Sequence, residues 1–332
     1  MKTSQFCDRP AMHRAWYAVA RSPDLARDPL AVTLLGEPYV LWRSEDGAVV
    51  AAPDRCPHRE APLSLGQLMD GRLQCAYHGW TFGAGGRCVL VPSANEGVPV
   101  PPKAHLSPLH VAERYGLVWM CPSEPAAGIP EIPQDTDPAY RRLNVDVELW
   151  RASATRLTDN FVDISHFPFV HTGTFGLAQE THVPKVELGH LDDSFYGYSY
   201  EVNVNNDAFG ASVSGLSTKV LTRRMTTGFN LPFAVRSTIH YETGLDHILL
   251  LLSTPVDDVT SLFTFVVWRN DDFTVPADEV LRFDKAIGAE DKRMLEQVPG
   301  VLPLDATALV SVQADKASVE WRRQFVTLLE SA

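Results

Sequence analysis

Two cysteine–histidine pairs constrain the fold of this chain more than any other feature. In the segment CPHREAPLSLGQLMDGRLQCAYHGW one residue separates Cys56 from His58, and two residues separate Cys75 from His78. Each pair offers one thiolate and one imidazole, both of which are strong metal ligands. The chain between the pairs must therefore fold so that two short loops meet at one metal centre.

Two kinds of metal centre use two cysteines and two histidines. Structural zinc takes such a set, but its ligand pairs usually leave two or more residues between ligands, and Cys56-x-His58 leaves one. A Rieske [2Fe–2S] cluster holds one iron through two cysteines and the other through two histidines. The spacing favours the cluster, with zinc as the alternative.

The sequence around the pairs indicates a small β domain. From about residue 16 to 120, short apolar runs such as YVLW and GLVWMC alternate with turn residues, which is typical of short antiparallel strands. A proline-rich segment at 123–138 follows and has no periodic pattern, as expected of a linker. We predict a first domain at 1–125, a linker at 126–138 and a second domain at 139–332.

The second domain is expected to mix helices with strands. Its pattern predicts a helix over 155–167, a strand-rich region over about 185–270, and a long amphipathic helix over about 276–298. A last helix is predicted over 317–329. The fold class is therefore α+β, and no internal repeat is found.

Charge and hydropathy exclude several classes of protein. The formal net charge is −12, and all of the excess lies after residue 130, since residues 1–130 contain 12 basic and 12 acidic side chains. Nucleic-acid binding requires a basic patch, so we expect no nucleic-acid partner. No apolar run reaches membrane-spanning length and no cationic, apolar leader opens the sequence. We expect a cytoplasmic protein that does not bind membranes.

A second metal site is indicated by the run NFVDISHFPFVH, residues 160–171. Asn160, Asp163 and His166 share one face of a regular helix, whereas His171 lies roughly 140° away from His166. Pro168 cannot donate a helical hydrogen bond, so we expect a kink there that brings the two imidazoles together. Polar side chains within an apolar run require mutual hydrogen bonds or a metal.

A site with two histidines also requires a carboxylate. The helix predicted over 276–298 carries two acids within its apolar stripe, Asp284 and Asp291. A buried carboxylate is costly unless it is paired or binds a metal. Periodicity does not choose between these two acids.

Three motifs together resemble the Rieske non-heme iron oxygenases. CPHR…CAYHGW is similar to the family's cluster signature, DISHFPFVH to its D-x-x-H-x4-H iron motif, and AEDKRMLE to its late acidic helix. The resemblance implies that Cys56, His58, Cys75 and His78 hold the cluster. It also implies that His166, His171 and Asp291 bind the mononuclear Fe(II), with Asp284 and Glu290 as alternatives to Asp291. Asp163 is then the bridging acid, and Asn160 lines the iron pocket.

The resemblance also implies a fold and an activity. It predicts an all-β Rieske domain followed by a helix-grip-like catalytic domain with a large antiparallel sheet. The similarity is greatest to O-demethylases of the vanillate and dicamba kind, caffeine-type N-demethylases and saxitoxin-pathway hydroxylases. The expected activity is monooxygenation, by hydroxylation or demethylation, of a small ring compound with O₂. A cis-dihydroxylating dioxygenase is the alternative, and a pure electron-transfer Rieske protein is the hypothesis from another class.

Partners follow from what the sequence contains. It has no dinucleotide-binding fingerprint, so NAD(P)H must act through a separate reductase or ferredoxin. The family's head-to-tail trimers imply a homotrimer in which an electron passes from His78 through Asp163 to His166 of the next subunit. We also expect His240 to contact the substrate. Further candidates for the pocket wall are Leu157, Phe161, Phe175, Met225, Phe229 and Trp268.

Overall fold

The computed structural model describes residues 5–331, except 272, 275 and 306. The chain divides into two compact units, Met1–Gly128 and Ile129–Ala332. None of the described helices is long and apolar enough to cross a membrane. Each unit is described separately below.

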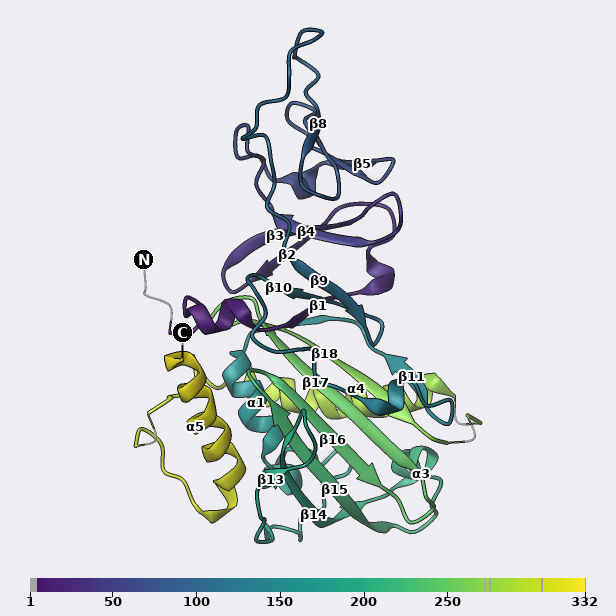
Figure 1. Cartoon of the computed structure of the whole chain (residues 1–332). Helices are drawn as coiled ribbons and strands as arrows, with labels where there is room; N and C mark the ends of the chain where they lie inside the picture. Colours follow the sequence, from purple (N-terminus) through teal and green to yellow (C-terminus); the bar gives the residue numbers. More distant parts are fainter. Residues whose placement is uncertain (1–4, 272, 275, 306, 332) are drawn as a thin grey trace. The chain divides into compact units, whose positions relative to one another are not determined.

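The first unit consists of three small antiparallel sheets, with strand orders β1-β10-β9, β2-β3-β4 and β5-β6-β7-β8 (Figure 1). The predicted β domain is confirmed, although β5, β6, β7 and β9 lie in segments with no distinct apolar run. The strands are β1 (Tyr17–Arg21), β2 (Leu30–Leu34), β3 (Glu37–Arg43), β4 (Val49–Pro53), β5 (Gln67–Met69), β6 (Arg72–Gln74), β7 (Thr81–Phe82), β8 (Cys88–Leu90), β9 (His110–Arg114) and β10 (Leu117–Cys121).

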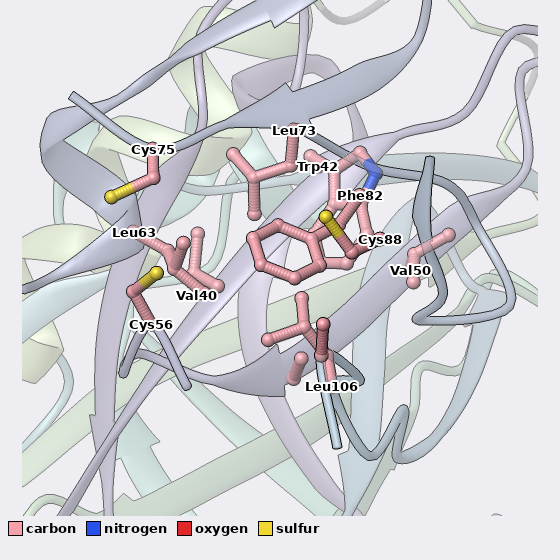
Figure 2. Close-up of a cluster of buried hydrophobic side chains, with 12 residues drawn as sticks. Val40, Trp42, Val50, Cys56, Leu63, Leu73, Cys75, Phe82, Cys88 and Leu106 are labelled. Carbon is pink, nitrogen blue, oxygen red and sulfur yellow. The ribbon is translucent and has the colours of Figure 1, made fainter. Parts of the chain in front are cut away.

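A hydrophobic cluster joins two of these sheets. Trp42 of β3, Leu73 of β6 and Phe82 of β7 are completely buried in it, and Cys56 and Cys75 lie at one edge (Figure 2). Burial of such large side chains stabilises a domain by about 1.5–3 kcal/mol each. The packing therefore supports the two cysteine loops on a rigid base.

The second unit is built on one antiparallel sheet with strand order β11-β18-β17-β16-β15-β14-β13, and β12 also pairs with β18 (Figure 1). The α+β class and the large antiparallel sheet are confirmed. The strands are β11 (Arg141–Asn144), β12 (Glu148–Trp150), β13 (Gly189–His190), β14 (Tyr196–Asn205), β15 (Val220–Asn230), β16 (Ala234–His240), β17 (Asp246–Pro255) and β18 (Ser261–Arg269). The helices are α1 (Ala154–Val162), α2 (Phe167–Val170), α3 (Ala208–Ser214), α4 (Ala277–Leu295) and α5 (Lys316–Glu330).

Helices α1 and α4 bring their functional side chains to the same face of the sheet. The α1 helix contacts β15, β16 and β17, and Val280 and Leu295 of α4 pack in one cluster with Phe263 and Phe265 of β18. The predicted positions of α4 and α5 are confirmed to within three residues at each end. The amphipathic period determined these positions, because each helix buries a single stripe.

The prediction of one helix over 155–167 with a kink at Pro168 is wrong. The α1 helix ends at Val162, and Asp163 has extended backbone angles (φ −87°, ψ 151°). The Asp163 carboxylate accepts the backbone N–H of His166 at 3.0 Å, which competes with helical hydrogen bonding. Pro168 lies in the first turn of α2, where a proline is tolerated.

Candidate metal centres and the cavity

Two loops of matching geometry carry the four candidate cluster ligands in the first unit. The N–H of Cys56 bonds to the carbonyl of Ala61, and the Cys56 carbonyl accepts the N–H of Glu60. In the second loop, the N–H of Cys75 bonds to the carbonyl of Trp80, and the Cys75 carbonyl accepts the N–H of Gly79. The fifth residue of each loop has a left-handed backbone, Glu60 at φ 60° and Gly79 at φ 70°, and glycine adopts this conformation without strain.

The side chains on these loops fit a [2Fe–2S] group. Cys56 and Cys75 are adjacent and each is 2% exposed, and burial raises the pKa of Cys56 to about 11 (Figure 2). A buried thiol of this kind keeps its proton until a metal cation binds the sulfur, which displaces the proton to solvent. The His58 and His78 rings lie 4.5 Å apart, and His58 stacks on Trp80. Desolvation lowers the pKa of His58, which leaves the neutral imidazole that a metal requires.

The second candidate centre lies in the Ile129–Ala332 unit. Nε2 of His166 is 3.2 Å from Nε2 of His171, and Oδ1 of Asp291 is 3.6 Å and 3.4 Å from these two nitrogens. Within the part of the chain that the structure describes, this is the one group of three ligand side chains spaced to hold a metal ion. Ligand atoms at about 2.1 Å from one ion and at right angles lie about 3.0 Å apart. The spacing therefore fits three adjacent ligands of a facial site.

Hydrogen bonds fix the tautomers of both imidazoles. His166 Nδ1 is 2.7 Å from Oδ2 of Asp163, and His171 Nδ1 is 3.0 Å from Oε2 of Glu290. Each Nδ1 faces a carboxylate and must carry a hydrogen, so each Nε2 directs a lone pair at the other and at Asp291. Three electron pairs that converge without a proton repel one another unless a cation lies between them.

Protonation states agree with this arrangement. Burial alone would raise the pKa of Asp163, but its hydrogen bonds with His166 and Ser165 outweigh burial, and the pKa lies below the ordinary value. Burial lowers the pKa of His171 despite the nearby Asp291 and Glu290. Asp163 is therefore ionised and His171 neutral at pH 7, as metal binding requires.

The structure brings the predicted side chains of the second site together. Asn160 donates from Nδ2 to Oδ1 of Asp291 at 3.0 Å, across 131 residues of sequence. Glu290, an alternative ligand in the prediction, contacts His171 from the far side and also accepts the N–H of Gly173. Asp284 is buried, with Oδ2 3.3 Å from Nε2 of His247. Of the three acids considered, Asp291 is the one near both Nε2 atoms.

The three side chains line a cavity with about 850 Å³ of empty space, including its opening to solvent. Its wall combines the apolar face of the sheet with α1 and α4, and it includes Phe161, Phe175 and Met225 as expected. Leu157, Phe229 and Trp268 are instead buried core residues and do not line it.

The expectation for His240 is also wrong. Its neighbours Ile239 and Tyr241 line the cavity, while His240 bonds through Nδ1 to Asp246. Successive strand residues face opposite sides of a sheet, so His240 lies on the other face. His247 and Arg223 do line the cavity, and sequence reasoning missed both. On β15, Leu221 and Met225 alternate with polar residues, which was the available signal for Arg223, whereas β17 has no such alternation around His247.

Comparison with known proteins agrees with both centres. Residues 15–106 match the Rieske [2Fe-2S] domain family, and residues 150–331 match the vanillate O-demethylase oxygenase C-terminal domain. The chain belongs to the Rieske non-heme iron oxygenases. Its first unit contains the [2Fe–2S] domain, so the zinc alternative is excluded, and its second unit contains the candidate site for mononuclear iron.

Individual members of the family match most of the chain. It is 32% identical to methylxanthine N1-demethylase NdmA of Pseudomonas putida over 98% of this chain and 91% of the relative. The structure of that protein with caffeine superposes with a TM-score of 0.86, covering 98% and 93% of the two chains. The dicamba O-demethylase oxygenase component of Stenotrophomonas maltophilia is 40% identical over 48% of each chain. This oxygenase is therefore close to terminal components that demethylate small ring compounds.

We predict that Glu290→Gln weakens iron binding at the mononuclear site. The glutamate accepts bonds from His171, Gly173 and the Thr174 hydroxyl, and its charge favours the Nδ1–H tautomer of His171. Loss of such an outer partner typically costs about 10- to 100-fold in metal affinity or activity. The change in iron affinity is measured by titrating Fe(II) into protein from which a chelator has removed the mononuclear iron. Unaltered iron affinity would show that Glu290 does not orient His171.

Proposed function

We propose that this oxygenase hydroxylates or demethylates a small ring compound and inserts one atom of O₂ per turnover. The convergence of His166, His171 and Asp291 at the wall of a largely apolar cavity carries the proposal. When bound there, Fe(II) supplies open coordination positions for O₂ activation with electrons from the cluster. The cavity's aromatic and aliphatic side chains exclude water and hold the ring against the site.

Each polar residue of the site has a role in this proposal. His166, His171 and Asp291 hold the iron, and Asn160 orients the Asp291 carboxylate through its amide. Asp163 and Glu290 set the two imidazole rings. In the first unit, Cys56, Cys75, His58 and His78 hold the cluster.

Electrons must come from outside the chain. Rieske oxygenase components work with a separate reductase or ferredoxin, through which NAD(P)H is the electron source. We further propose a homotrimer in the cytoplasm, in which His78 of one subunit lies near Asp163 of the next. The exposure of His78 and the bond between Asp163 and His166 support this path. A carboxylate that binds both imidazoles would couple the two centres.

The names of the relatives suggest the kind of substrate. NdmA acts on methylxanthines and the dicamba enzyme on an O-methyl compound, so we propose a ring that carries a methyl group on nitrogen or oxygen. Arene cis-dihydroxylation remains the alternative reaction. Pure electron transfer is disfavoured because the catalytic domain and its iron site occupy the second unit.

Product analysis tests this function. The purified oxygenase, a reductase and NADH are incubated with ¹⁸O₂ and a panel of N- and O-methylated ring compounds. We expect one ¹⁸O atom in the product or, for demethylation, formaldehyde in equal amount to the demethylated ring. A cis-diol with two ¹⁸O atoms would support the dioxygenase instead. Cluster reduction without any oxygenated product would contradict both.

A further inference from the structure

Arg223 lies in the wall of the cavity on the inward face of β15. Arg223, Met225 and Thr227 occupy every second position of the strand, and all three line the cavity. The adjacent Arg224 is exposed on the opposite face of the same strand. Two neighbouring arginines on one strand thus have opposite environments.

The guanidinium of Arg223 is buried, and no acid among the described residues forms an ion pair with it. The residue is 2% exposed, and its Nε has no hydrogen-bond partner. It makes cation–π contacts with two aromatic rings, at 5.3 Å from the ring centroid of Phe175 and 5.7 Å from that of Tyr241. No described carboxylate lies within 4.0 Å of it. Cation–π contacts offset only part of the cost of burying a charge.

A second buried arginine of the same sheet, by contrast, has a hydrogen-bond partner on each of its three guanidinium nitrogens. Arg269 is completely buried and bonds to the Asp271 carboxylate, the His247 ring and the Val213 carbonyl. Three acids among the described residues line the cavity. Asp284 faces Nε2 of His247 at 3.3 Å, while Asp163 and Asp291 face the imidazoles of the candidate iron site. None of these described acids lies at ion-pair distance from Arg223, so the cavity is the place from which a partner can reach it.

The position of Arg223 relative to the iron site limits the size of that partner. The Phe175 ring stacks on His171 with centroids 4.7 Å apart, and Arg223 lies over the same Phe175 ring. The guanidinium carbon therefore lies no more than about 10 Å from the ring centre of His171, a candidate iron ligand. A substrate with one ring can place a methyl group near the iron and an anionic group near Arg223.

We propose that Arg223 binds a carboxylate on the substrate, so that the oxygenase prefers monocyclic aromatic or heteroaromatic acids. This inference rests on the proposed function for its reaction, but not for its binding step. A guanidinium forms paired, charge-assisted hydrogen bonds with a carboxylate, and these are strongest where water is excluded. The neutral ring systems bound by methylxanthine demethylases lack such a group.

Matched pairs of probes test the proposal. About twenty methoxy- or methylamino-substituted aromatic carboxylates and their primary amides are screened anaerobically against the metal-loaded enzyme by ligand-observed NMR. The dissociation constants of the hits are then measured by calorimetry at pH 7. We expect carboxylates to bind roughly 10- to 100-fold more tightly than their amides. Arg223→Met should abolish that preference and change amide affinity by less than about twofold, and Arg223→Lys should retain part of it.

Arg224→Met is the matched control, because it removes the same charge from the outer face of β15. It should leave the preference unchanged. If carboxylates bind no more often or tightly than amides, including the case in which neither binds, the proposal is wrong. It is also wrong if Arg223→Met weakens both members of a pair equally. The comparison of carboxylates with amides on the wild-type enzyme does not depend on whether a variant folds. It uses neither O₂ nor reductant, so its outcome is independent of the product analysis.

Discussion

Asp291→Ala is expected to release the mononuclear iron and abolish turnover while the [2Fe–2S] cluster stays bound. The two imidazoles alone would supply only nitrogen ligands, and loss of the carboxylate also removes the charge that offsets Fe(II). Asn160 would lose its acceptor at the same time. The loss of activity should exceed the roughly 100-fold that removal of an outer partner costs.

Iron analysis together with the visible spectrum of the cluster measures this result. The iron content should fall by the one atom per chain that the mononuclear site holds, and the absorption of the cluster should not change. Asp278→Ala is a control on the same helix, since Asp278 is exposed in the first turn of α4. Full iron content in Asp291→Ala would refute the assignment of this carboxylate as a ligand.

Asp163→Asn, loaded with iron to full occupancy of both metal centres, is expected to reduce turnover by about 100-fold. Asparagine keeps an oxygen that accepts the His166 N–H and Nδ1–H bonds, but it carries no charge. Because the carboxylate is ionised in the native protein, the substitution removes the group proposed to couple the two centres. Asp163→Ala would also lose the bond that ends the α1–α2 turn.

A single-turnover experiment isolates the affected step. The reduced variant is mixed with O₂ and substrate, and the oxidation of the cluster is followed by absorbance. We expect slow oxidation in Asp163→Asn and a nearly normal rate in Ser165→Ala, which removes only the hydroxyl that donates to Asp163. Normal turnover in a metal-replete Asp163→Asn enzyme would eliminate Asp163 from the electron path.

Local patterns predicted the features that depend on neighbouring residues. The amphipathic period located α4 and α5, because each helix buries one stripe whatever it packs against. The one-residue gap between Cys56 and His58 favoured a cluster, because zinc ligand pairs usually leave two or more residues between them. This spacing could be read directly because both ligands lie on one loop. The break between the two helices was predicted at Pro168, but it lies at Asp163, before His166. It arises from a hydrogen bond of the Asp163 side chain, whereas Pro168 fits a helical first turn.

The choice among neighbouring residues depended on tertiary structure. His171 meets Glu290 and Asn160 meets Asp291 across more than a hundred residues, so no local period reveals these pairs. On the strands, a shift of one residue exchanges the two faces of the sheet. The sequence by itself thus indicated which residue types and motifs are candidates for the two metal centres. Only the folded sheet decided that Arg223 and His247 line the cavity while Arg224 and His240 do not, because strand pairing fixes which face is enclosed.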